Sequence, residues 1–370
     1  MPAKSPRYSS LSTQVATTLR EEIVRGVWID WLPGERVLAE TLQVSRETLR
    51  TALAQLRHDG HLEPNHASGN RIIRTKRAPR RKSQEEAIVA LLTPDPPELM
   101  RPYVSLWVNE LKTLLMENGV LLRHYNGQKF FTHHPAKALV KLISRQSAGC
   151  WLLANSTKAT QLWFSGRPTP CVIAGTCHLG IDLPQVDLDH YALCRHAAGV
   201  LLAAGHRRLA LLSEHSGRAG DIQSEAGFLA GVRASPHPEA SPLVLNHDHS
   251  PASICNSLSR LLEMPQTPTA LLVSNGASYL TVTSTLAQRG LRVPQDISVL
   301  SRDDEPFLGF LIPKPTYYAA SPHIFAKRIM KPLLQSLRGE PVVPRSTRIL
   351  PSFTKGASLR TLSPKSVQPD

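Results

Sequence analysis

From residue 87 onward, short apolar segments alternate with longer amphipathic ones, and this alternation constrains the fold more than any other feature. The strand-like segments are AIVALLT, VLLRHY, GCWLLA, TPCVIAG, RLALLSE, PLVLNHD, TALLVSN and ISVLSRD. Helical patterns cover about 98–118, 135–146, 192–205, 222–233, 251–263 and 277–289. Strands that alternate with helices form parallel sheets through right-handed crossovers. More than five such units exceed one sheet, so we predict two α/β lobes with a cleft between them.

The segment ahead of these lobes has a different plan. Residues 11–25 and 35–42 show helical spacing of apolar residues, with a break at Pro33-Gly34. In VSRETLRTALAQLRHDG, Ser45 is placed to cap a third helix, whose apolar stripe is Leu49, Ala52, Leu53 and Leu56. Two short extended pieces follow around a polar turn. Helix, helix, turn, helix and β-hairpin predict a winged helix-turn-helix.

The positive charge of the chain is concentrated near its start. The formal charge is +14, and residues 1–82 hold 15 Lys and Arg against 8 Asp and Glu, a net of 15 − 8 = +7. Residues 74–82, RTKRAPRRK, include six basic side chains and no acidic one. Such a run is usually a solvated linker, but beside a DNA-binding module it adds attraction to phosphates.

These patterns predict five segments. They are a disordered start (1–9), a winged helix-turn-helix (10–75), a basic linker (76–86), a two-lobed effector-binding and dimerisation domain (87–357) and a flexible tail (358–370). The predicted fold class is therefore α/β, with a winged helix-turn-helix ahead of a two-lobed, Rossmann-like sensor domain.

The third predicted helix of the first domain is the candidate for insertion into DNA. Arg46, Thr48 and Arg50 lie within its first turn and a half and away from the leucine stripe. Arginine near the start of a helix in the major groove can pair with guanine edges or bind phosphates. For the helix alone, an ordinary surface helix is the better interpretation. The preceding helix, the following hairpin and the local charge favour DNA binding.

Residues 10–75 resemble the winged-helix domain of the GntR family of bacterial transcription regulators. The matching lines are LREEIVRG, LPGERVLAETLQVSRETLRTALAQLRHDGHL and the wing HASGNRI. The resemblance implies DNA contacts by Arg36, Ser45, Arg46, Thr48, Arg50, Ser68, Gly69, Asn70 and Arg71. Two positions depart from the family pattern: Gly34 replaces a serine N-cap worth about 1 kcal/mol, and Gln43 stands where glycine is usual. The wing has SGN in place of a G-x-G-T pattern.

Residues 87–356 resemble the effector-binding domain of the lactose-repressor/galactose-repressor family, a periplasmic-binding-protein-like type I fold. The matching lines are AAGHRRLALL, EAGFLAGV, LLVSNGASYLTVTSTLAQRGLRVPQDISVLSRDDEP and LPSFTKGAS. The resemblance implies a homodimer whose inter-lobe cleft closes on a small polar effector, such as a sugar or a derivative. It also implies that Asn275 and Asp303 contact that effector.

Two other ligand positions of that family have changed. Gly276 follows Asn275 where the family has aspartate, and Ser224 stands where the family has arginine. Ser301 and Arg302 also replace a glycine and an aromatic residue ahead of the Asp pair. We therefore expect either an effector other than the usual sugar or a degenerate pocket. Candidates for replacement contacts are Tyr279, Arg218 and Asp95, with surface or packing roles as the alternative.

Other function classes have weak support. The pairs His133-His134 and His247/His249 lack a third ligand nearby, so we expect loop histidines and no metal site. We find no hydrolase, zinc-protease or phosphate-loop motif, and we predict no enzymatic activity and no cofactor. No apolar run reaches the roughly 18 residues needed to span a membrane.

The remaining signals concern location and assembly. The five cysteines include no C-x-x-C pair and indicate buried thiols in a reducing cytoplasm; they are Cys150, Cys171, Cys177, Cys194 and Cys255. Trp107, on the first helix of the lobes, is a candidate for the dimer interface.

We therefore predict a cytoplasmic, homodimeric transcription regulator, a repressor of a catabolic operon, that binds a double-stranded DNA operator under the control of a small molecule. Two alternatives stay open. One is a ligand-independent DNA-binding protein whose sensor-like domain serves only dimerisation. The other is an enzyme domain fused to a winged helix.

Overall fold

The computed structural model describes residues 10–25, 28, 31–65, 69–73 and 87–362. The chain forms two compact units, Met1–Gln84 and Glu85–Asp370. Three parts of the sequence-based prediction lie outside the described residues. They are the expected disordered start (1–9), the basic linker (76–86), together with residues 74 and 75, and Ser68 of the wing.

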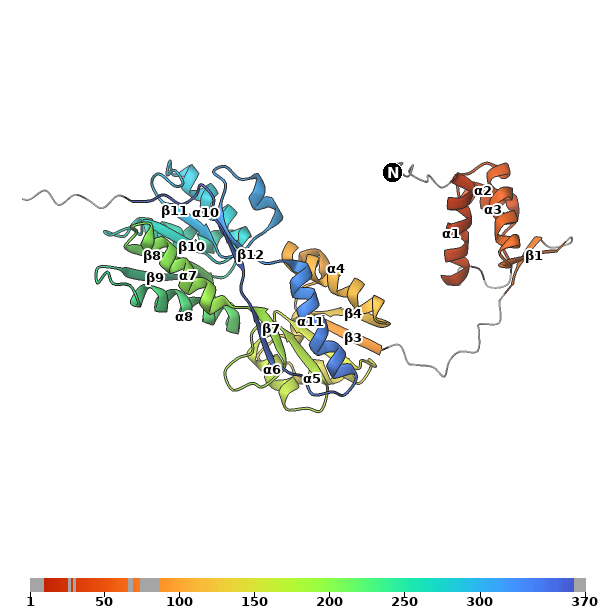
Figure 1. Ribbon diagram of the computed structural model, residues 1–370, viewed down its shortest axis with the longest axis horizontal. Coiled ribbons are helices and arrows are strands. Elements are labelled where there is room, and N and C mark those ends of the chain that lie inside the picture. The colour runs from red at the N-terminus through yellow and green to blue at the C-terminus, as the bar shows by residue number, and fades with distance from the viewer. Residues whose placement is uncertain (1–9, 26–27, 29–30, 66–68, 74–86, 363–370) are drawn as a thin grey trace, which may run out of the picture. The chain divides into compact units, whose positions relative to one another are not determined.

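The first unit is a three-helix head with a β-hairpin (Figure 1). Its elements are α1 (Leu11–Arg25), α2 (Glu35–Thr41), α3 (Arg46–His58), β1 (Leu62–Asn65) and β2 (Gly69–Ile72). The predicted stripe of α3 is fully buried and packs with Leu19 of α1 and Leu38 of α2. The antiparallel hairpin pairs Leu62 with Ile72, so both of these side chains also enter the core. The prediction of a winged helix-turn-helix is confirmed.

Two departures from the family pattern lie at the two ends of α2. Gln43 has a φ of +53°, in the left-handed region that glycine adopts at little energetic cost. Gly34 precedes α2 with no side-chain hydrogen bond to the helix start. Ser45 caps α3 as predicted, because its hydroxyl accepts from the Thr48 backbone N–H at 3.1 Å.

The second unit contains two six-stranded sheets (Figure 1). The first lobe has the order β13-β7-β6-β5-β3-β4, and the second has β14-β12-β11-β10-β8-β9. The first-lobe strands are β3 (Ala87–Thr93), β4 (Val120–Asn126), β5 (Cys150–Ala154), β6 (Cys171–Ala174), β7 (Gln185–Leu188) and β13 (Ser346–Ile349). The second-lobe strands are β8 (Arg208–Glu214), β9 (Ser241–His247), β10 (Ala270–Val273), β11 (Ser298–Ser301), β12 (Thr316–Ala319) and β14 (Ser352–Thr354). Only the β12–β14 pair is antiparallel among these described strands.

Helices cover the sheets on both faces, as parallel sheets require. The α-helices are α4 (Pro102–Glu117), α5 (Ala136–Ile143), α6 (Lys158–Ser165), α7 (His190–Ala203), α8 (Ala219–Arg233), α9 (Pro251–Leu262), α10 (Gly276–Gln288) and α11 (Pro322–Leu337). Short 3-10 helices span Pro97–Leu99, Gln128–Phe130 and Pro306–Phe310. The predicted two-lobed α/β architecture is confirmed. The sequence patterns did not predict α6, β7 or any element after β11.

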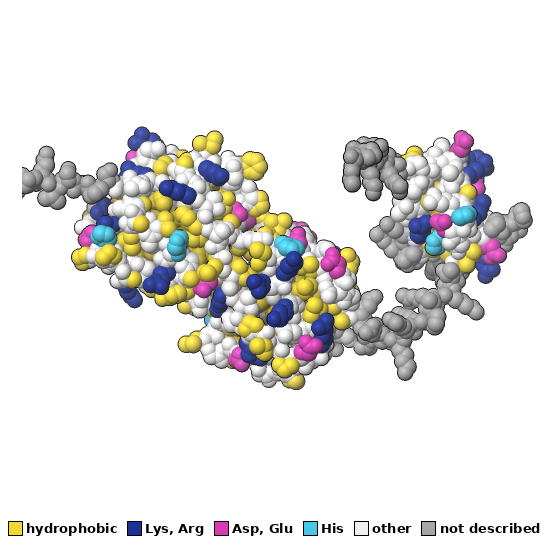
Figure 2. Space-filling view, in the orientation of Figure 1, with side chains coloured by type: hydrophobic (Ala, Val, Ile, Leu, Met, Phe, Trp, Pro, Cys, Tyr) yellow, Lys and Arg dark blue, Asp and Glu magenta, His cyan; other side chains and the backbone are white. Residues whose placement is uncertain are grey.

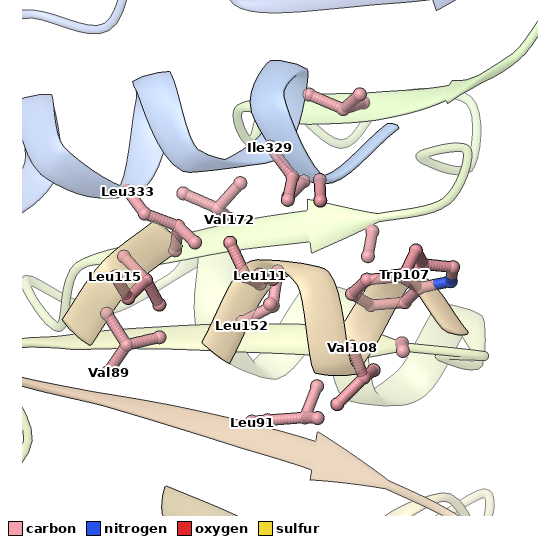
Figure 3. Packing of buried hydrophobic residues seen from close by; sticks show 14 of the residues in the cluster. Val89, Leu91, Trp107, Val108, Leu111, Leu115, Leu152, Val172, Ile329 and Leu333 are labelled. Carbon is pink, nitrogen blue, oxygen red and sulfur yellow. The ribbon is translucent and has the colours of Figure 1, made fainter. Parts of the chain in front are cut away.

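The chain passes between the lobes three times: from β7 to α7, from β12 to α11, and from β13 to β14. As a result, α11 belongs to the first lobe, although it follows the second lobe in sequence. Figure 3 shows α11 and α4 packed over strands of that lobe through side chains such as Ile329, Leu333 and Leu111.

Trp107 lies in this core, and its expected role at a dimer interface is wrong. The side chain is 3% exposed, and its ring centroid lies 5.1 Å from that of Phe325 on α11. Packing between two helices of one lobe therefore accounts for this tryptophan.

The second lobe continues into the segment expected to be a flexible tail. The Ser358 hydroxyl is buried and donates to the backbone oxygen of Val299 at 2.5 Å. The Leu362 N–H donates to the backbone oxygen of Ala204 at 2.7 Å. Residues 358–362 therefore belong to the folded domain, and the boundary expected at 357 is wrong.

All five cysteines are free thiols, and Cys150, Cys171 and Cys194 are buried as expected, while Cys177 and Cys255 are half-buried. Within the described ranges, no helix is both long and apolar enough to cross a bilayer.

Candidate nucleic-acid interface and inter-lobe cavity

The exposed face of α3 begins with side chains that are available for binding. Arg46 is exposed and makes no hydrogen bond or ion pair within the described part of the chain. Arg50 is 68% exposed, and its Nε lies 2.9 Å from Oε2 of Glu35 at the start of α2. Arg36 is also exposed and lies 3.8 Å from Glu40. These three guanidinium groups are separated from the leucine core.

Three other residues expected to contact DNA, namely Ser45, Thr48 and Asn70, form hydrogen bonds within the head. The hydroxyls of Ser45 and Thr48 lie 2.8 Å apart at the start of α3, so both are engaged in capping. Asn70 is buried, and its Oδ1 accepts from Nε and Nη2 of Arg57 on α3, at 2.9 and 2.5 Å. This position argues against the DNA contact expected of Asn70, because its side chain joins the wing to α3.

The other two described wing residues expected to contact DNA, Gly69 and Arg71, are exposed. Gly69 has a φ of +92°, and Arg71 lies opposite both Glu63 and Trp31. Figure 2 shows basic, acidic and histidine side chains intermixed on the visible face of the head. The DNA contacts expected from the sequence stay predictions, and Arg46 and Arg71 have the fewest competing partners.

A cavity lies between the two lobes of the second unit. Its lining combines apolar walls, including Trp107 and Phe325, with many charged and polar groups. The polar lining residues are Arg101, Tyr103, Asn155, Ser156, Thr176, Asp187, His190, Glu214, Arg218, Asp221, Asn275, Arg302, Asp303 and Asp304. Three residues expected from the sequence, Asn275, Asp303 and Arg218, are therefore brought together.

Asp303 lies at the centre of an ion-pair network. Oδ1 lies 3.3 Å from Nε of Arg302, and Oδ2 lies 2.8 Å from Nη2 of Arg101, which belongs to the opposite lobe. Burial alone would raise the pKa of Asp303. The guanidinium groups of Arg302 and Arg101 outweigh that effect and lower the pKa to about 2. This carboxylate therefore stays ionised at every pH at which the protein would function.

Arg302 restores a guanidinium group that the sequence pattern suggested was lost. It extends from the end of β11, and its Nη1 donates to the Ser224 hydroxyl at 2.8 Å and lies 3.1 Å from Asp221. Ser224 is the position where the related family has arginine. The structure thus places a guanidinium beside Ser224 from a different element.

Glu305 occupies the space beside Gly276. A Cβ atom on Gly276 would lie only 2.5 Å from Cγ of Glu305, so an aspartate there would collide with that side chain. Glu305 is 2% exposed, and its Oε1 accepts from Nη2 and Nε of Arg101, at 2.8 and 3.1 Å. Charged groups therefore lie beside both positions at which the related family's ligand contacts have changed.

Two polar atoms in the cavity wall are buried without a partner among the described residues: the Tyr103 hydroxyl and Nδ1 of His190. The other ring nitrogen of His190 lies 3.5 Å from Asp187. That carboxylate also accepts from the Thr176 hydroxyl at 2.6 Å. Buried polar atoms without partners are uncommon, and in a cavity they indicate ligand contacts.

The remaining expected residues are placed as follows. Arg218 lies 2.5 Å from Glu214 and 3.6 Å from Asp221. The Asn275 Oδ1 accepts from the Ser278 N–H at 2.8 Å, so this oxygen caps α10. Asn275 also lines the cavity.

Tyr279 and Asp95 do not line the cavity. Tyr279 is 1% exposed in the core of the second lobe. Asp95 accepts from Gln128 at 2.9 Å. These positions argue against the effector contacts expected of both residues, and they match the packing and surface roles named as the alternative.

Arg101, Tyr103, His190 and Glu305 were not predicted from the sequence. Arg101 and Tyr103 follow β3, at the edge where the carboxyl ends of parallel strands form ligand sites, and this rule could have found them. Within the described residues, no group of three or more His, Cys, Asp or Glu side chains is arranged to hold a metal ion.

Two family models match separate parts of the chain. Residues 11–72 match the bacterial regulatory proteins of the gntR family, and residues 198–359 match the periplasmic binding protein-like domain. Among curated proteins, the arabinose metabolism transcriptional repressor of Geobacillus stearothermophilus is 25% identical over 295 residues, which cover 75% of this chain and 76% of that repressor. The transcriptional repressor CytR of Escherichia coli K12 is 22% identical over 268 residues, covering 70% and 76%.

Solved structures show the same fold. A transcriptional regulator CelR–cellobiose complex has a TM-score of 0.65 at 19% identity and covers 95% of this chain and 100% of that one. A regulatory protein of the LacI family from Chloroflexus aggregans has a TM-score of 0.63 at 16% identity and covers 73% and 98%. The described architecture is thus that of a GntR-type head joined to a periplasmic-binding-protein-like domain.

Proposed function

Because this chain is a DNA-binding transcription regulator with a GntR-type helix-turn-helix domain and a periplasmic-binding-protein-like domain, we propose that a small molecule in the inter-lobe cavity controls its affinity for an operator. The regulator would act as a repressor and bind in the cytoplasm, where its operator lies. The relatives include an arabinose metabolism repressor and a regulator solved with cellobiose. A catabolic operon is the corresponding proposal for this chain.

The observation that carries DNA binding is the start of α3. Arg46 extends from the first turn of a helix whose opposite face is buried, and no described partner neutralises it. A positive group at this position is suited to a base edge or a phosphate in the major groove. Arg36 and Arg50 would add further contacts after releasing their exposed glutamate partners, which contribute little to stability.

We also propose a homodimer on a pseudo-palindromic operator. Two heads one helical turn apart would read the two half-sites, and cleft closure would change their spacing. A solved structure similar to the second unit is a dimeric Lac repressor, with a TM-score of 0.65 at 18% identity. This likeness supports a dimer of the second unit.

A gel-shift titration tests the proposal. The operator is first selected from a random DNA library with the full chain. Arg46→Ala should weaken binding to this operator about 5- to 150-fold, since one specific contact is worth about 1–3 kcal/mol. The matched control is Arg338→Ala, which removes the same charge from an exposed site at the C-cap of α11. Equal operator preference in Arg46→Ala and the parent would contradict the proposed role of this helix.

One alternative has a specific observation in its favour. Arg101 joins the two lobes through ion pairs of the chain itself, with Asp303 and Glu305, as in a second unit that serves only as a ligand-independent dimerisation scaffold. The unpartnered Tyr103 hydroxyl and His190 nitrogen favour a ligand site instead. We propose no enzymatic role.

A further inference from the structure

We propose that the inter-lobe cavity is a cation site that holds the guanidinium of Arg101 in place of an external ligand, and that its effector carries a guanidinium or amine group. This inference rests on the proposed function, because it names the chemical class of the effector.

The charges around the cavity favour a cation. Five carboxylates line it, from Asp187, Glu214, Asp221, Asp303 and Asp304, against three guanidinium groups. The difference, 3 − 5, leaves a charge of −2 before His190 is counted. Glu305, behind this lining, adds a further carboxylate. An anionic ligand would enter against this charge.

The three arginines are also already paired. Arg101 binds Asp303 and Glu305, Arg218 binds Glu214, and Arg302 binds Asp221 and Asp303. An anionic ligand would have to break a buried pair to gain a guanidinium partner. Leaving the released carboxylate buried and unpaired is costly.

The groups without partners are suited to a ligand that donates hydrogen bonds. The Asp304 carboxylate lines the cavity and has no ion pair within the described ranges. The ring of His190 has Nε2 facing Asp187, and its Nδ1 has no partner among the described residues. The Tyr103 hydroxyl can accept as well. An ammonium or guanidinium group, which only donates, satisfies such acceptors.

Arg101 shows where a guanidinium fits. Its Nη2 lies 2.8 Å from both Asp303 and Glu305, and these carboxylates belong to the second lobe while Arg101 belongs to the first. The Arg101 side chain is 36% exposed. Rotation of this side chain would release a deeply buried carboxylate pair to an incoming cation. Arg101 therefore acts as a tethered competitor of the effector and holds the lobes together until the effector arrives.

Chemical rescue of full-length Arg101→Ala tests the inference. The substitution leaves a guanidinium-sized space beside two buried carboxylates. We expect the substitution to lower the unfolding temperature of the second unit. This temperature is measured by thermal shift, once in 50 mM guanidinium chloride and once in 50 mM sodium chloride. Guanidinium should lower the unfolding equilibrium constant of the variant about tenfold if 50 mM is ten times its Kd. The wild type should show no such gain.

Two controls define the result. Arg338→Ala should show no specific gain from guanidinium, because its exposed site has no buried carboxylates. Adding Glu305→Gln to Arg101→Ala should weaken the rescue. If Arg101→Ala does not fold, Arg101→Gln replaces it, and guanidinium should stabilise this variant too. Equal stability in guanidinium and sodium for the folded variant would overturn the inference. The operator gel shift of the wild type tests the proposed function independently, since it depends on the head.

Discussion

Replacing Arg302 should show how much its buried guanidinium group, which lies beside Ser224, stabilises the second unit. In the native chain, Arg302 is buried and reaches Asp221, Asp303 and the Ser224 hydroxyl. Removing one partner of a buried ion pair costs about 3–5 kcal/mol. Because Asp303 would retain Arg101 as a partner, Arg302→Ala should lower the free energy of unfolding by about 3 kcal/mol, at the lower end of this range. This corresponds to an increase on the order of 150-fold in the unfolding equilibrium constant.

The assay is urea denaturation of the full chain, in which the fluorescence of the tryptophans in the second unit reports unfolding. With a slope near 3 kcal/mol per molar urea, the midpoint should fall by about 1 M. Arg292→Ala is the control, because its pair with Asp296 is exposed and screened by solvent, so its loss should leave the midpoint nearly unchanged.

A double substitution tests the transfer itself. Ser224→Arg with Arg302→Phe would return the guanidinium to α8 and an aromatic side chain to β11. This double variant should be more stable than either single variant, with a coupling energy of about 1–3 kcal/mol. The reasoning is refuted if Arg302→Ala shifts the midpoint no more than Arg292→Ala does.

Three further predictions concern local features. Gln43→Gly should stabilise the head by about 0.5–1 kcal/mol by relieving a left-handed residue, and a lower melting temperature would contradict this. Asn70→Ala should destabilise the head by about 1–2 kcal/mol because Arg57 loses its wing partner, whereas Glu63→Ala on the same hairpin should change little; both are measured by thermal denaturation. Burial lowers the pKa of His206 to about 4, so its stabilising contribution is present above about pH 6.5 and is lost as pH falls toward 4, by up to about 3 kcal/mol. Urea unfolding at pH 7 and 5 should show a smaller pH effect in His206→Gln, and an equal effect would rule out this origin.

The head could be predicted closely because its signals are local. The Ser45 cap, the leucine stripe of α3 and the break before α2 each lie within one or two helical turns. The strands of the second unit up to β11, except β7, were similarly marked by apolar runs. The elements β13 and β14 have only four and three residues, and their pairing partners are distant in sequence. Tertiary pairing selects such short strands, and local pattern does not reveal it.

The cavity was only partly predictable for a related reason. Asn275 and Asp303 are the same residue types that the related family has at these positions, so the sequence resemblance alone predicted that they line the cavity. The replacement of one guanidinium depends on Ser224 and Arg302 being neighbours in space, although 78 residues separate them in sequence. Glu305 fills the space beside Gly276 from another loop in the same way. Each position considered by itself therefore suggested that a charged side chain was lost. In the structure, a charged side chain from another part of the chain lies beside each of these positions.

The return of α11 to the first lobe has a consequence during synthesis. Residues 87–188 leave the ribosome well before 322–349, so the growing chain must carry an unfinished lobe while the other is made. Until then, the apolar side of α4, with Trp107 and Leu111, has no cover from Phe325 or Ile329. A chaperone that shields this helix would act in the interval, and chains released before residue 349 would lack the last strand of their first sheet.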